Sequence, residues 1–164
     1  MKLEIVPIGL IHSPHRQAEG TPIQSRWAEA VEGSVEVFPQ FAPGLRDLEG
    51  FERIWLLCWF DRAREAKLEV VPYLDTSSRG VFATRAPSRP NPIGLSCVRL
   101  LAVEGSRLRV AELDVLDGTP LLDIKPYVPD FDVFGVKRVG WYANARGRRR
   151  ADTRFSKAPR AGGQ

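Results

Sequence analysis

Short, strand-like apolar segments recur along this chain at close spacing, and helical patterning is weak. Residues 62–69 are the best candidate for a short helix, and residues 45–50 for a turn. Two of the strand-like segments, joined through Gly105, form the clearest hairpin. The pattern is typical of an all-β domain, so the sequence predicts a mainly β fold, either a small barrel or a sandwich. We expect strands at residues 3–12, 34–38, 51–60, 70–72, 80–84, 95–103, 107–115 and 121–125.

The last of these strands carries charged side chains at alternate positions. Successive side chains of a strand point to opposite sides. Asp123 and Lys125 are therefore expected on one face, and Leu122 and Ile124 on the other. The two charged residues are placed either to pair with each other or to act in a binding site.

Length and composition point to one soluble globular domain. The chain has 164 residues, of which 43% are hydrophobic and 27% charged. Its longest apolar run, residues 54–60, is too short to cross a bilayer. The N-terminus has no secretory h-region, so we expect a cytoplasmic protein with no membrane contact.

The few histidines and cysteines limit the chemistry. His12 and His15 are too few for a His-rich metal centre. Cys58 and Cys97 lie in strand-like runs, where buried free thiols suited to a reducing cytoplasm are expected. Sequence motifs for P-loops, Rossmann nucleotide sites and zinc sites are absent. We therefore expect no bound metal.

Basic charge gathers near the C-terminal end. Residues 144–164 carry a net charge of +6, whereas residues 1–143 carry a net charge of −2. We predict an ordered domain over residues 1–143 and a basic, disordered tail over residues 144–164. Such a tail suits contact with nucleic-acid phosphates. The alternative is a solvated extension without a partner.

Two polar, turn-rich segments are candidates for a binding site: residues 80–96 (GVFATRAPSRPNPIGLS) and residues 117–127 (DGTPLLDIKPY). In the first, each proline fixes its own φ near about −65° and holds the preceding residue extended. Arg89 and Asn91 therefore lie on a short, stiff rod. Rigid presentation of polar groups is what a preformed ligand site requires. A structural Pro-rich connector is the alternative.

These segments closely resemble the TsaA-like family, whose characterised bacterial members, often called TrmO, are S-adenosylmethionine-dependent tRNA methyltransferases. The resemblance covers about three quarters of the chain. It implies a small, single-domain β-barrel with short helices, unlike Rossmann methyltransferases, and a homodimer. The implied reaction transfers a methyl group from S-adenosylmethionine to N6 of threonylcarbamoyladenosine in the tRNA anticodon loop. Further matching segments are PIGLIHSP (residues 7–14), LRDLEGF (45–51), IWLLCWF (54–60) and IKPYVP (124–129).

A site for this cofactor needs a basic group for the α-carboxylate, acceptors for the α-ammonium group and an apolar slot for adenine. Arg85 can hold a carboxylate through two N–H groups. The Asp117 turn offers polar groups, with a plain Asp-Gly turn as the alternative, and two leucines offer either apolar contact or ordinary core packing. The resemblance places residues 25–27 in the cofactor loop. We assign to the cofactor site Ser25, Arg26, Trp27, Asp61, Arg62, Arg85, Leu100, Leu116, Asp117, Gly118 and Thr119.

The attacking nitrogen must lose a proton, so the site needs a proton acceptor. Asp117 and Asp123 are the candidates on the rigid segments, and Asn91 is a further catalytic candidate. The tRNA and its threonyl carboxylate are assigned to Arg89, Asn91, Lys125 and Tyr127.

The sequence departs from the family pattern in two places. An Arg-rich segment stands where many bacterial members carry a further C-terminal domain, which bears on the choice of tRNA. Family members often have another residue at the position of Asp61. Two other functions remain open: an RNA-binding module that binds S-adenosylmethionine without catalysis, and a methyltransferase acting on another RNA or a small molecule.

Overall fold

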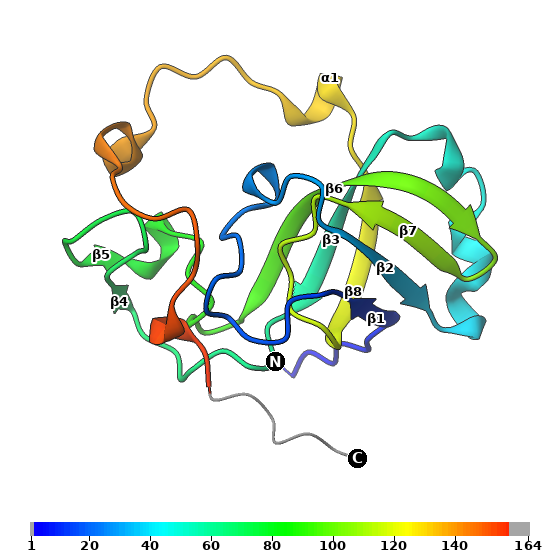
Figure 1. Ribbon diagram of the computed structural model, residues 1–164, viewed down its shortest axis with the longest axis horizontal. Coiled ribbons are helices and arrows are strands. Elements are labelled where there is room, and N and C mark those ends of the chain that lie inside the picture. The colour runs from blue at the N-terminus through cyan, green and yellow to red at the C-terminus, as the bar shows by residue number, and fades with distance from the viewer. Residues whose placement is uncertain (1, 158–164) are drawn as a thin grey trace.

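The computed structural model describes residues 2–157 and contains a closed barrel of antiparallel strands (Figure 1). Its strands are β1 (Gly9–His12), β2 (Glu32–Val37), β3 (Arg53–Trp59), β6 (Ile93–Glu104), β7 (Arg107–Ala111) and β8 (Thr119–Pro126). They follow the order β1-β2-β7-β6-β3-β8 around the barrel, and β8 pairs with β1 to close it. The predicted mainly β fold is confirmed, and its form is the barrel.

Short elements lie beside and between the barrel strands (Figure 1). A two-stranded sheet pairs β4 (Glu69–Val70) with β5 (Arg79–Gly80). The one α-helix of the described residues is the single turn α1 (Pro129–Asp132), and no helix in this part of the chain is long and apolar enough to cross a membrane. The 3₁₀ helices are η1 (Ser25–Trp27), η2 (Pro39–Leu45), η3 (Leu48–Gly50), η4 (Val81–Ala83), η5 (Gly140–Asn144) and η6 (Thr153–Phe155).

Aliphatic side chains at alternate strand positions fill the barrel interior. In β3, Ile54, Leu56 and Cys58 are fully buried, while the residues between them are half-buried. Burial of each large aliphatic side chain contributes about 1.5–3 kcal/mol. The other strand residues of this core are Ile11, Val35, Val37, Val98, Leu108, Val110 and Leu121.

The alternation in β8 differs from the predicted one. Leu121 is fully buried, and Ile124 packs against the core, although these two residues are an odd number of positions apart. The register of β3 with β8 shifts between Leu57 and Cys58, which pair with Asp123 and Leu121. This bulge leaves one extra residue in β8 and changes which side chains face inward. Leu122 and Ile124 were predicted on one face, but Ile124 packs against the core together with Leu121 rather than with Leu122.

Other predicted segments differ in extent or type. Residues 81–83 of the strand predicted over 80–84 form η4, and the strand predicted over 107–115 ends at Ala111. The first strand begins at Gly9 rather than at residue 3. Residues 62–69 form no helix, and two of their backbone N–H groups bond to distant segments instead of to the preceding turn. The N–H of Arg64 donates to Phe155 O at 3.0 Å, and the N–H of Lys67 donates to Ser88 O at 3.2 Å. The hairpin of β6 and β7 is confirmed.

The basic segment from residue 144 is folded as far as residue 157, which differs from the predicted disordered tail. Its backbone pairs with the N-terminal loop: the N–H of Ile23 donates to Arg149 O, and the N–H of Ala151 donates to Thr21 O. Phe155 is 6% exposed and packs edge-on against the ring of Tyr73, 5.1 Å between centroids. These contacts offset the entropy of ordering the segment. Residues 158–164 of the predicted tail lie outside the described residues.

Candidate functional site

A cavity of about 1090 Å³ lies at one end of the barrel. Residues that follow β3, begin β6 and connect β7 to β8 line it, together with the N-terminal loop, the Pro-rich segment and parts of residues 139–156. In an antiparallel barrel of this order, the end of β3 and the start of β6 lie at the same end. Ligand pockets typically occupy 300–1,000 Å³, so this cavity has room for a ligand of cofactor size.

The N-terminal loop forms one wall of the cavity, where Ser25, Arg26 and Trp27 of η1 all contribute to the lining. The folded C-terminal segment supports this wall from behind. The guanidinium of Arg149 lies over the Trp27 ring, 5.0 Å from its centroid. The loop therefore owes part of its position to a residue more than a hundred positions away.

The Pro-rich segment forms a second wall, and it brings Arg85, Arg89 and Asn91 to the lining. Arg85 Nη1 donates to the side-chain oxygen of Gln24 at 2.7 Å, which ties this wall to the N-terminal loop. Arg89 Nη1 donates to Thr84 O at 3.2 Å, so its guanidinium also braces its own segment. Arg85 and Asn91 remain exposed.

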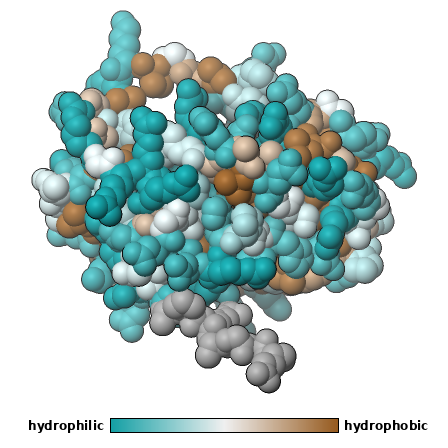
Figure 2. Space-filling view, viewed as in Figure 1, coloured by the Kyte–Doolittle hydropathy of each residue, from teal (hydrophilic) through white to brown (hydrophobic). Residues whose placement is uncertain are grey.

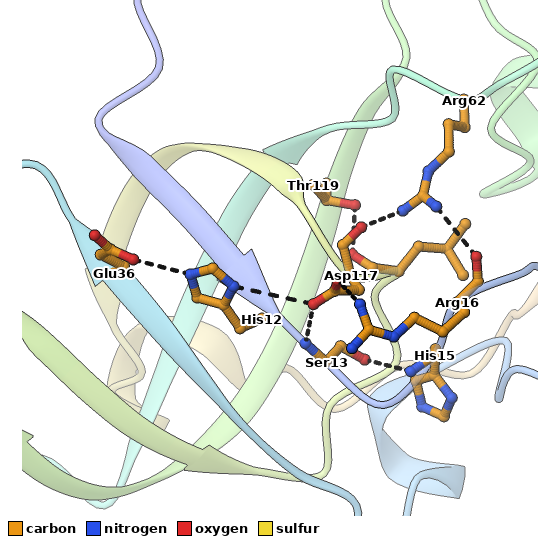
Figure 3. A network of polar contacts seen from close by, with 9 residues as sticks. His12, Ser13, His15, Arg16, Glu36, Arg62, Asp117 and Thr119 are labelled. Atoms are coloured by element: carbon orange, nitrogen blue, oxygen red, sulfur yellow. Dashed lines mark hydrogen bonds and ion pairs between the residues drawn. The ribbon is translucent and has the colours of Figure 1, made fainter. Parts of the chain in front are cut away.

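The carboxylate of Asp117 lies outside the cavity lining, within a polar network on residues 12–16 (Figure 3). It accepts a hydrogen bond from the Ser13 N–H at 3.0 Å and pairs with Arg16. His12 Nδ1 is 4.0 Å away. Arg62, which lines the cavity, donates to the backbone oxygens of Asp117 and Arg16. This network fixes the loop after β1 to the turn before β8.

The remaining assigned residues divide between the cavity and the barrel wall. Asp61, Leu116 and Thr119 belong to the lining; Asp61 Oδ1 lies 4.0 Å from Arg62 Nε. Asp123 and Lys125 pair with each other at 2.8 Å. Outside the lining are Leu100, Asp117, Gly118, Asp123, Lys125 and Tyr127.

Tyr127 is not part of the lining, but it lies beside a residue that is. Its centroid is 5.9 Å from that of Trp55, and Trp55 belongs to the lining. Leu100 instead packs against the barrel core.

One carboxylate that lines the cavity was not predicted from the sequence. Asp114 lies between Leu113 and Val115, both buried in the core, and it is itself half-buried. Ser96 Oγ donates to Asp114 Oδ1 at 2.6 Å. Burial raises the pKa of Asp114 to about 6, against the opposing effects of Ser96 and Arg85. An acidic residue between two apolar ones was the available signal.

Aromatic residues beside the cavity were also not predicted from the sequence. Trp141 and Tyr142 of η5 belong to the lining, as does Phe82 of η4, whose side chain is 76% exposed. Trp141 Nε1 donates to Ala83 O at 2.8 Å, which ties η5 to η4. The guanidinium of Arg79 lies 6.0 Å from the Trp141 ring centroid. We call Phe82, Trp141 and Tyr142 the aromatic rim.

Fold and cavity together define a β-barrel ligand-binding domain whose site lies at one end of the barrel. Residues 10–133 match the family described as the tRNA-methyltransferase O N-terminal domain. The crystal structure of TrmO from Pseudomonas aeruginosa superposes with a TM-score of 0.72 at 40% identity, covering 86% of this chain and 63% of that one. The chain belongs to this family.

Two relatives are similar to most of this chain. A probable S-adenosyl-L-methionine-binding protein of Pyrococcus abyssi is 56% identical over 135 residues, 82% of this chain and 73% of that protein. The tRNA (adenine(37)-N6)-methyltransferase of Escherichia coli is 37% identical over 132 residues, 74% of this chain and 56% of that protein. The chain therefore spans little more than half of the bacterial enzyme.

Proposed function

We propose that this protein is an S-adenosylmethionine-dependent tRNA methyltransferase that methylates N6 of threonylcarbamoyladenosine beside the anticodon. The observation that carries the proposal is the cavity at the end of the barrel, where a cationic and an anionic side chain face a space lined by aromatic rings. The name of the Escherichia coli relative supports the same reaction class, and the name of the Pyrococcus abyssi relative supports the same cofactor. We assign the activity to the cytoplasm, in keeping with a tRNA substrate.

The residues of the cavity fit the cofactor's functional groups. Arg85 is exposed and can bind the α-carboxylate through two N–H groups. Asp61 provides an acceptor for the α-ammonium group, and Phe60, Trp27 and Leu116 offer apolar surface for the adenine ring. When bound, S-adenosylmethionine supplies a methyl group on a sulfonium centre. The protein's own contribution is to position this group against the substrate nitrogen.

The aromatic rim is suited to single-stranded RNA. Unstacked bases of an anticodon loop stack on aromatic side chains, at about 1–3 kcal/mol per base. Phe82 and Tyr142 are exposed, and Arg79 lies beside Trp141. Exposed basic residues of the C-terminal segment, such as Arg146 and Arg148, are suited to contact the phosphates. We assign this face to tRNA, together with Arg89 and Asn91.

We also propose that the protein acts as a homodimer. The segment from α1 to η5 arches away from the barrel (Figure 1). Several of its apolar side chains are exposed. Figure 2 shows brown patches along this edge of the molecule. Phe131, Phe134 and Val136 are 71%, 75% and 67% exposed. Contiguous exposed apolar surface of this kind marks an interaction site, and a second copy of the chain is the partner that the family resemblance implies.

The decisive experiment is mass spectrometry of tRNA nucleosides after incubation with the purified protein and S-adenosylmethionine. The expected product is the N6-methylated form of threonylcarbamoyladenosine. A second candidate is an RNA-binding module that holds S-adenosylmethionine without transferring its methyl group, which the names of the archaeal relatives favour. Cofactor binding without any methylated nucleoside would select that candidate.

Sedimentation equilibrium tests the dimer, and a monomer of 18.4 kDa at micromolar concentration would contradict it.

A further inference from the structure

Asp114 is held rigidly at the wall of the cavity. It follows the end of β7, where Glu112 adopts a left-handed backbone conformation with φ of 66° and pairs with Arg53 at 2.8 Å. Leu113 and Val115 on either side are 0% and 2% exposed. With both neighbours anchored in the core, the Asp114 side chain has little freedom to leave the cavity wall.

Three separate segments converge on the Asp114 carboxylate. Ser96 Oγ from β6 donates to Oδ1 at 2.6 Å, and Ser96 is 4% exposed. The backbone N–H of Ser25 in η1 also donates to the carboxylate, and Arg85 acts on it electrostatically. Because an ionised carboxylate offers about four acceptor sites, acceptor capacity remains toward the cavity.

The surroundings of Asp114 suit a group that exchanges protons near neutral pH. Burial is the largest effect and raises its pKa to about 6, while Ser96 and Arg85 act in the opposite direction. On β3, burial and the nearby Asp114 raise the pKa of Cys58 to about 12, so this thiol stays neutral. Because Cys58 is neutral, the charged group that acts on Asp114 is Arg85. A general base works best when its pKa lies near the operating pH.

We infer that Asp114 accepts the proton that the target nitrogen loses during methyl transfer. The inference rests on the proposed function. In the balanced step, the nitrogen forms a bond to the methyl carbon, and the carbon–sulfur bond breaks with its electron pair passing to sulfur. The nitrogen's proton passes to the Asp114 carboxylate, and solvent then takes it up.

The other candidate carboxylates lie in less suitable places. Asp117 directs its carboxylate to Ser13 and Arg16, outside the cavity lining. Asp123 pairs with Lys125 and also lies outside the lining. Asp114 combines contact with the cavity, two hydrogen-bond donors that fix its orientation and a proton affinity suited to exchange.

The test replaces Asp114 with Asn in the full chain and follows methylation of tRNA against pH. The amide keeps an acceptor for the Ser96 hydroxyl but takes up no proton in this range. We expect kcat to fall by about 10²–10⁴-fold. In the unsubstituted protein kcat/KM should rise with pH through about 6, and the variant should lose this rise. S-Adenosylhomocysteine binding, measured by calorimetry, should be largely retained, and Asp114→Glu should recover part of the rate.

Asp47→Asn is the matched control, because Asp47 is exposed, lies outside the cavity lining and has a φ of 66° that asparagine tolerates. An unchanged kcat and pH profile in Asp114→Asn, or a raised KM alone, would overturn the inference. If that variant does not fold, Ser96→Ala decides: loss of one donor should move the rise in kcat/KM to higher pH, and an unmoved profile overturns the inference. An unsubstituted protein that methylates no tRNA would instead overturn the proposed function itself.

Discussion

Replacing Asp114 with Asn should remove a specific pH dependence of folding stability. Burial raises the pKa of Asp114 from 3.8 to about 6. The folded state therefore holds this proton more tightly than the unfolded state, and stability falls as pH rises from about 4 to about 6. A difference of about 2 in pKa corresponds to about 3 kcal/mol of unfolding free energy. The ionised carboxylate is thus a destabilising feature at neutral pH.

Urea unfolding of both proteins across this range measures the effect. Other titrating groups are common to the two proteins, so the difference between their unfolding free energies isolates Asp114. We expect the Asn variant to gain about 3 kcal/mol relative to the unsubstituted protein between pH of about 4 and about 7. Asp47→Asn should show no such gain, because that side chain is exposed. A difference that stays constant with pH would refute the reasoning.

Four further changes test the cavity, its C-terminal wall and the dimer. Phe155→Ala should cost about 3–5 kcal/mol locally; hydrogen exchange at the Ile23 amide should accelerate roughly 100-fold or more, while the exposed Phe82→Ala leaves it unchanged. Deleting residues 144–164 should weaken tRNA binding in filter assays and reduce its salt slope by about 0.7–0.9 per lost phosphate contact. Because residues of this segment line the cavity, calorimetry should also show weaker cofactor binding. Arg85→Ala should lower S-adenosylhomocysteine affinity by about 10-fold or more, as expected for a lost charge-assisted pair, and unchanged affinity would remove Arg85 from the site. Phe134→Glu should shift sedimentation to an 18.4 kDa monomer without unfolding the barrel.

The parts of the fold that follow from local rules were predictable from the sequence. The β6–β7 hairpin closes through Gly105, whose φ of 63° suits glycine in a tight turn. The bulge in β8 was not predictable, because it depends on pairing with β3, which is distant in sequence. In the same way, the order of residues 144–157 depends on the N-terminal loop and on a pocket around Tyr73. The high charge of residues 144–157 suggested a solvated segment. Phe155 is the one large apolar residue there, and it alone indicated packing against the protein.

The site was predictable as a set of segments and less so as a set of side chains. The Pro-rich segment, residues 25–27 and Arg62 do line the cavity. Asp117 does not, because Arg16 and Ser13, which no local rule connects to it, take its carboxylate. Asp114 was not predicted as a site residue, because its sequence position suggests an exposed side chain. Only the folded structure brings Ser25 and Ser96 against it.

The narrow barrel explains why the site lies at its end. Even eight strands leave an interior only wide enough for side chains, and here aliphatic residues fill the six-stranded barrel. Ligand space must therefore be built beyond the strands, which requires close control where the barrel meets the loops. Gly94 provides it: a Cβ there would lie 2.3 Å from the Phe60 ring, so only glycine lets this cavity-lining ring pack against the start of β6. The prolines of residues 80–96 stiffen this wall of the cavity, and Gly94 of the same segment sets the position of the Phe60 ring.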